Sequence, residues 1–170
     1  AARLYEASLG LERELGDGGR IAMALSALGD VARGRGDLEQ AMTYYEEGLS
    51  LVRDLGDRGR TAATLASLGE VARARADLGG AAAFYEESLT LFRALGNARS
   101  SATLLANLGH LAHAQGDERR AADLYRDTLT LEREMGDKAR LADALNNLGN
   151  TVRLLGDYRR ATAFHEEALA

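Results

Sequence analysis

The chain repeats one pattern four times at a fixed interval of 40 residues. The pattern begins with two leucines and a glycine, continues with an aspartate and an alanine, and ends with an aromatic residue. Its first copy is Leu25, Leu28, Gly29, Asp37, Ala41 and Tyr45. The last copy carries His165 in the aromatic position. A fixed period of this size is the signature of an array of structural repeats, and it constrains the fold more than any other feature of the sequence.

Each repeat contains two turn signals, most of them the dipeptide Gly-Asp. Glycine favours the left-handed backbone conformation just after a helix ends, and aspartate accepts hydrogen bonds at the start of the next helix. Between the turns the apolar residues follow the helical period, as Leu25, Leu28 and Ala32 do. The sequence therefore predicts an all-α fold with about nine helices. These helices are expected near residues 1–15, 18–35, 38–55, 58–75, 78–95, 98–115, 118–135, 138–155 and 158–169.

Connections this short make neighbouring helices pack antiparallel. We expect one array over residues 1–170, and we interpret the sequence as a fragment of a longer protein because both ends fall within a repeat. The expected parts are the second helix of a partial repeat (1–16), three full repeats (17–56, 57–96 and 97–136) and a truncated repeat (137–170).

Two details of the repeat carry a conformational cost. Gly29 and its copies lie in the middle of a helix, where glycine costs roughly 1 kcal/mol relative to alanine. We expect them to allow close approach of a small residue of the partner helix, Ala41 or its copies. Ala76 replaces the turn glycine, so its turn should be the loosest of the set or should close without a positive φ.

Composition narrows the function classes. The protein has a net charge of −5 and contains neither cysteine nor proline, which excludes disulfides and thiolate metal sites. No apolar run approaches the roughly 18 residues that would span a bilayer. A mildly acidic sequence with interspersed charges also lacks the basic face that nucleic acid requires. We expect a cytoplasmic protein that binds neither membranes nor nucleic acids.

The order Leu-x-x-Leu-Gly, a small residue at Ala32 or its copies, and then Gly-Asp-x-x-x-Ala-x-x-x-Tyr or His resembles the tetratricopeptide repeat. The unit here has 40 residues rather than the commoner 34, and the family's usual proline at the end of the second helix is missing. Long units of this kind look like those of kinesin light chains, spindle-orientation adaptors and the sensor arms of bacterial signalling ATPases and transcription regulators. The alanine-rich and arginine-rich composition favours a bacterial source.

The resemblance implies a right-handed superhelical array of antiparallel helix pairs, a solenoid whose first helices line a concave groove. It also implies a non-catalytic module that binds an extended peptide or partner segment in that groove. The alternative that it implies is a sensor or regulatory arm of a larger bacterial signalling ATPase or transcription regulator. Architecture alone carries no chemistry, so the function depends on the groove residues.

The groove lining is expected on the side of each first helix opposite Leu25, Leu28 and their copies. It consists of four rows at one register: Met23, Ala27, Asp30 and Arg33; Ala63, Ser67, Glu70 and Arg73; Thr103, Asn107, His110 and His113; and Asp143, Asn147, Asn150 and Arg153. In the first two rows the acid and the arginine can pair within the helix at i, i+3.

The last two rows favour backbone recognition. The amides of Asn107 and Asn147 carry donors and acceptors that could hold an extended peptide regardless of its sequence, as similar positions do in kinesin light chains. The alternative is that they are solvated or bind a neighbouring helix. Arg33, Arg73 and Arg153 form an interrupted ladder suited to carboxylates, so an acidic protein or peptide segment is a sensible partner. The alternative here is an ordinary solvated face.

Other candidate sites are weaker. His110, His113 and Glu70 could be imagined as a metal site, but no established metal-binding spacing accompanies them, and we expect neither metal nor cofactor. The Glu pairs 46/47, 86/87 and 166/167 are expected on a solvated outer face, and no nucleophile paired with a base is recognisable, so we expect no catalytic residues. Leu4, Tyr5 and Leu9 could form an exposed apolar end face that permits end-to-end self-association.

Overall fold

The computed structural model describes residues 2–169 and, within them, contains nine α-helices and no strand. The helices are α1 (Ala2–Leu15), α2 (Gly18–Gly34), α3 (Leu38–Asp54), α4 (Arg58–Ala74), α5 (Leu78–Ala94), α6 (Ala98–Ala114), α7 (Glu118–Met135), α8 (Lys138–Leu154) and α9 (Tyr158–Ala168). Every predicted boundary is confirmed to within one residue, apart from Ala1, which lies outside the described residues. None of these helices is both long enough and apolar enough to cross a membrane.

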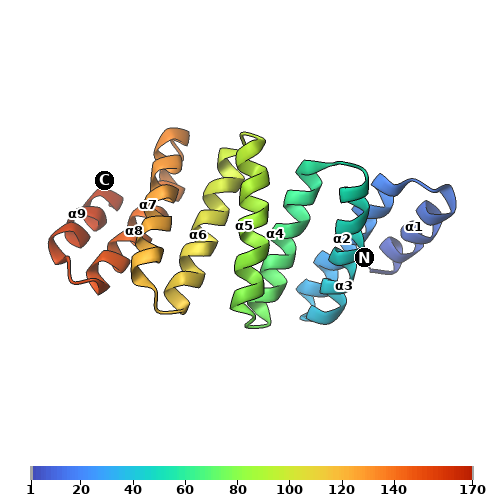
Figure 1. Cartoon of the computed structure of the whole chain (residues 1–170), viewed down its shortest axis with the longest axis horizontal. Helices are drawn as coiled ribbons and strands as arrows, with labels where there is room; N and C mark the ends of the chain where they lie inside the picture. The colour runs from blue at the N-terminus through green and yellow to red at the C-terminus, as the bar shows by residue number, and fades with distance from the viewer. Residues whose placement is uncertain (1, 170) are drawn as a thin grey trace. The chain divides into compact units, whose positions relative to one another are not determined.

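The protein forms two compact units, residues 1–91 and 92–170. The first contains α1 to α4 and most of α5, and the second contains the last turn of α5 and α6 to α9. Within each unit, helices that follow one another in the sequence pack side by side (Figure 1). The predicted all-α architecture of consecutive helix pairs is confirmed. The exact limits of the repeats stay a prediction.

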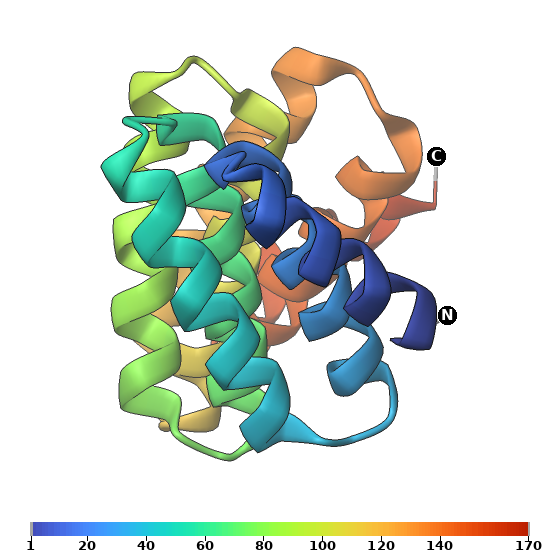
Figure 2. The same ribbon diagram turned by 90° about the vertical axis from the view of Figure 1, so that its right-hand side faces the viewer.

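The turns are closed by the residues that the sequence singles out. The Asp37 side chain accepts a hydrogen bond from the backbone N–H of Gln40 and so begins α3, while Gly36 takes φ +80° after α2. Figure 2 shows this hairpin, where the backbone descends along α2 in blue, turns in light blue and returns along α3 in cyan. Asp57 caps α4 in the same way through the N–H of Arg60. Capping satisfies backbone donors that would otherwise lack a partner, which explains why the boundaries can be read from the sequence.

The turn at Ala76 differs from our expectation. Ala76 adopts φ +61°, and its N–H donates to Arg73 O at 3.0 Å, as the Gly36 N–H does to Arg33 O. The prediction that this turn closes without positive φ is wrong, and it loses none of the hydrogen bonds of its glycine counterpart. The turn therefore carries the strain of a left-handed alanine.

The mid-helix glycines make room for a tyrosine ring rather than for an alanine. A Cβ on Gly29 would lie 2.6 Å from Cε1 of Tyr45, and one on Gly109 would lie at the same distance from Cε1 of Tyr125. The expected contact with Ala41 was therefore wrong, although the expected close approach is confirmed. The reason is size, because the flat ring fills the space between the paired helices and leaves none for a Cβ.

The cores are built from the leucines of the pattern. In the first unit Leu25, Leu65 and Leu68 are fully or almost fully buried, and in the second Leu105, Leu145 and Leu148 are buried in the same way. Leu9 packs against Leu25 and Leu28 and is only 6% exposed, so the expectation that it belongs to an exposed end face was wrong. Leu4 and Tyr5 are exposed as expected.

Candidate functional site

In the first unit the expected rows border a cavity between α2 and α4. Its volume is about 380 Å³. Five of the eight residues expected in the first two rows line it: Met23, Ala27, Asp30, Ala63 and Ser67. The predicted residues are thus brought together within this unit. Val52 and Arg60 also line the cavity, and the sequence pattern did not assign them to it.

The acids of these two rows bind both an arginine and a tyrosine. Arg33 Nη2 lies 3.4 Å from Asp30 Oδ1, and Arg73 Nη2 lies 2.7 Å from Glu70 Oε2, so the predicted i, i+3 pairing is confirmed. The hydroxyl of Tyr45 also donates to Asp30 at 2.8 Å. This second partner was missed, because the tyrosines were read only as aromatic members of the repeat pattern.

The hydrogen bonds shift the ionisation of the groups concerned. Burial opposes ionisation of Glu70, but the hydrogen bonds from Arg73 and Tyr85 outweigh it and lower the pKa of Glu70 below its ordinary value. Burial, together with the hydrogen bond to Asp30, raises the pKa of Tyr45. The tyrosine therefore stays a neutral donor and the carboxylate stays charged at physiological pH.

In the second unit the expected rows border another cavity, of about 390 Å³, between α6 and α8. Five of the eight expected residues line it: Thr103, Asn107, His110, Asp143 and Asn147. Asn107 and Asn147 are half-buried on its wall. The exposed residues His113, Asn150 and Arg153 lie outside the lining. The amide-bearing rows are therefore brought together, without the C-terminal ends of their helices.

The three histidines have separate surroundings. His113 Nδ1 lies 2.8 Å from Glu118 Oε1, and the His110 ring contacts the Tyr125 ring with 5.5 Å between centroids. His165 takes the tyrosine's position, since a Cβ on Gly149 would lie 2.8 Å from its Cε1. Across residues 2–169, no group of three or more His, Asp or Glu side chains is placed to hold a metal ion.

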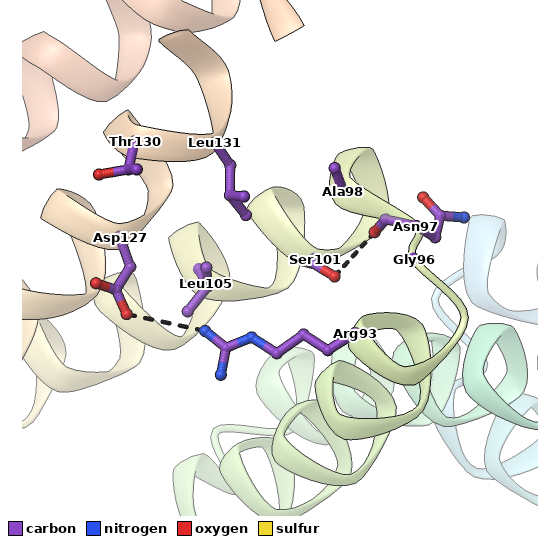
Figure 3. A pocket seen from close by; sticks show the side chains of 9 residues that line it. All are labelled: Arg93, Gly96, Asn97, Ala98, Ser101, Leu105, Asp127, Thr130 and Leu131. Atoms are coloured by element: carbon purple, nitrogen blue, oxygen red, sulfur yellow. Dashed lines mark hydrogen bonds and ion pairs between the residues drawn. The ribbon is translucent and has the colours of Figure 1, made fainter. Parts of the chain in front are cut away.

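A third cavity, of about 420 Å³, lies in the second unit and contains none of the expected residues. Figure 3 shows Arg93 reaching toward Asp127 of α7, with Leu105 and Ser101 of α6 beside it. The Arg93–Asp127 ion pair is long, at 3.8 Å. The following repeat carries Leu141 where this one has Ser101, so a smaller side chain leaves more space here.

Ion pairs link successive second helices at one register, 34 residues apart. They are Arg13–Glu47 at 2.5 Å, Arg53–Glu87 at 2.6 Å, Arg93–Asp127 at 3.8 Å and Arg133–Glu167 at 2.6 Å. The expectation of a merely solvated face was wrong for Glu47, Glu87 and Glu167. The signal was present in the sequence, because the arginines recur at the 40-residue period as the acids do.

Comparisons with known proteins agree with this architecture. The family model described as tetratricopeptide repeat matches residues 20–94, 60–134 and 102–170. Among curated proteins none matches. The protein is similar to the crystal structure of BtubC (BKLC) from P. vanneervenii, with a TM-score of 0.83 and 25% identity, over 99% of its own length and 70% of that of BtubC.

Two further solved structures share the fold. A putative kinesin light chain with nearly identical repeats from Podospora anserina has a TM-score of 0.81 and 12% identity over 98% of the present sequence and 83% of its own. A signal transduction ATPase with numerous domains and a repeat sensor, from Pyrococcus horikoshii, has a TM-score of 0.82 and 19% identity. That match covers 97% of the present sequence but only 26% of the ATPase.

Proposed function

Because the protein belongs to the tetratricopeptide repeat family, whose repeats are protein-interaction modules, we propose that it is a non-catalytic module that binds an extended segment of a partner protein. The binding surface is formed by the first helices of the repeats, α2 and α4 in one unit and α6 and α8 in the other. The partner is a protein rather than a membrane or a nucleic acid. A bacterial and cytoplasmic setting remains a prediction from composition.

The observation that carries this proposal is the cavity lined by Asn107 and Asn147. Two amides one repeat apart, half-buried on the wall of one cavity, can donate to and accept from the backbone of an extended segment. Polar groups in a partly enclosed position gain more from such bonds than fully solvated ones do, because less competing water reaches them. The cavity thus supplies orientation without demanding a particular partner sequence.

The test uses the full-length protein and the partner that it captures from its own cell extract. Once the partner is identified, its affinity is measured for the wild type and for the double substitution Asn107→Ala with Asn147→Ala. We expect a loss of about tenfold or more, equivalent to about 1.4 kcal/mol. The control is Thr162→Ala, an exposed residue of α9. Unchanged affinity in the double variant, with helicity and melting preserved, would refute the groove assignment.

A second candidate is a sensor arm within a larger signalling ATPase or transcription regulator. It is favoured by the similarity to an ATPase that carries a repeat sensor, of whose length the matching part is only 26%. The open reading frame around this sequence decides between the two. A nucleotide-binding or helix-turn-helix segment would support the sensor arm, and repeats alone would support an adaptor.

A further inference from the structure

Two positions eight residues apart take a different form in each copy of the repeat. One lies in the last turns of a second helix and the other in the first turn of the next first helix. The four copies read Glu12 with Arg20, Val52 with Arg60, Phe92 with Ser100, and Glu132 with Arg140. The same place in the fold is thus occupied by an ion pair twice, by a neutral pair once, and by an arginine opposite a valine once.

In the first and last copies a buried glutamate binds the arginine. Glu132 is 1% exposed and its Oε1 accepts from Arg140 Nε at 2.7 Å, while Glu12 is 6% exposed and lies 2.9 Å from Arg20 Nη2. Each pair lies on the wall of a cavity of about 390 Å³ beside a first helix. Buried carboxylates of this kind require a cationic partner, so each arginine at this register is matched to one carboxylate.

In the second copy the arginine is present and the glutamate is not. Arg60 lines the cavity of the first unit together with Val52, the residue that replaces the glutamate. Its contacts are longer than those of Arg20 and Arg140. Nε lies 3.4 Å from Asp57 Oδ2, Nη1 3.5 Å from Gly19 O and Nη2 3.6 Å from Met23 Sδ. Asp57 is already engaged as the cap of α4, so it offsets the charge of Arg60 only in part.

We propose that the cavity of the first unit binds a carboxylate through Arg60, in the place that Glu12 and Glu132 fill in the other copies. The proposal rests on the proposed function and names the chemistry of the partner segment at this point. A guanidinium binds a carboxylate through two parallel hydrogen bonds, which a single distant Asp57 contact does not satisfy. The carboxylate comes from an Asp or Glu side chain or from the C-terminus of a peptide.

The rest of the cavity suits a side chain that carries such a group. Ala27 and Ala63 leave room between the helices, and Ser67 adds a hydroxyl. Asp30 is the acid on this wall, and it is paired with Arg33 and Tyr45, so its charge is compensated where it lies. The positive charge that remains to be matched in this cavity is therefore that of Arg60.

The test is a titration of the ¹⁵N-labelled protein with short peptides, followed through the arginine Nε–Hε resonances. The probes are a terminally blocked Ala-Ala-Glu-Ala-Ala, its Gln counterpart, and a penta-alanine with a free C-terminus and a blocked N-terminus. The Arg60 resonance is assigned with Arg60→Lys. We expect saturable movement of this resonance with the Glu peptide and at least tenfold weaker binding of the Gln peptide. A response to penta-alanine would identify the C-terminus as the source.

Two substitutions exchange the arrangements between copies. Val52→Glu supplies the internal carboxylate, and we expect it to abolish the response of Arg60, whereas Val52→Leu should retain it. Glu132→Val removes the internal carboxylate from the other unit, and we expect the Arg140 resonance to gain a response to the Glu peptide. This second variant keeps the test valid if Val52→Glu fails to fold.

Equal binding of the Glu and Gln peptides, or an unchanged response in folded Val52→Glu, would overturn the carboxylate assignment. Absence of any response to the Glu peptide would overturn it as well. None of these results touches the proposed function, which is judged separately by partner affinity in the Asn107 and Asn147 variants.

Discussion

The hydroxyl of Tyr85 donates a hydrogen bond to the carboxylate of Glu70 at 2.6 Å, while the ring of the same tyrosine covers Gly69. One side chain thus fills the space between two paired helices and also holds a charged residue of the expected binding row. Tyr45 does the same for Asp30 over Gly29. Packing inside the repeat and the electrostatics of its surface are coupled through this residue, which makes the following predictions possible.

Replacing Gly29 by alanine should destabilise the fold by about 1 to 3 kcal/mol, because the new Cβ would overlap the Tyr45 ring. Gly34 of the same helix is the matched control, since a Cβ there meets no atom within 4 Å. Gly34→Ala should leave stability unchanged or raise it by up to about 1 kcal/mol. Urea denaturation of the two variants measures the difference. Equal effects would contradict the ring contact.

Replacing Ala76 by glycine should stabilise the protein by about 1 kcal/mol, because glycine adopts φ +61° without a steric penalty. The reverse substitution, Gly36→Ala, introduces the same strain at φ +80° and should cost a similar amount. Thermal and urea denaturation check both values. If Ala76→Gly weakened the fold, entropy of the unfolded state would outweigh the turn strain.

Protonation of Glu70 should destabilise the fold in acid. Its pKa in the folded state lies below the ordinary value of 4.5, so the unfolded state binds more protons as the pH falls through this range. The stabilisation by Glu70 is complete above about pH 4.5 and disappears as the pH falls through the lowered pKa. Comparing stability against pH for the wild type and Glu70→Gln isolates this contribution.

Tyr85→Phe supplies the control for that titration. The variant loses one of the hydrogen bonds that lower the pKa of Glu70, so this pKa should rise. The ¹³C resonance of the Glu70 carboxyl group reports it directly. A pKa that did not move would show that Arg73 alone sets the ionisation of Glu70.

The ion pairs between second helices should differ in strength with their length. Arg133–Glu167 at 2.6 Å should show a coupling free energy within the usual range of about 0.2 to 1 kcal/mol for exposed pairs, and Arg93–Asp127 at 3.8 Å should show less. Double-mutant cycles with alanine measure both, and added salt should reduce them. A stronger coupling for the longer pair would contradict this interpretation.

The helices and their limits could be read from the sequence because their causes are local. Gly36 and Asp37 act within one turn of the backbone, and the spacing of Leu25 and Leu28 places both on one side of a helix whatever surrounds it. The i, i+3 pairing of Glu70 with Arg73 is local for the same reason. The 40-residue period then carried these local conclusions along the whole sequence.

Tertiary packing decided the rest, because it depends on how each helix is rotated against its neighbour. The sequence placed Asn107 and Asn147 at one register, but only the packing of α6 against α8 puts them on one cavity wall. The choice of Tyr45 over Ala41 as the residue above Gly29 follows from the depth to which a ring reaches between paired helices. The difference between Arg60 and Arg140 depends on whether the facing residue is Val52 or Glu132, a relationship visible only once both are placed in space.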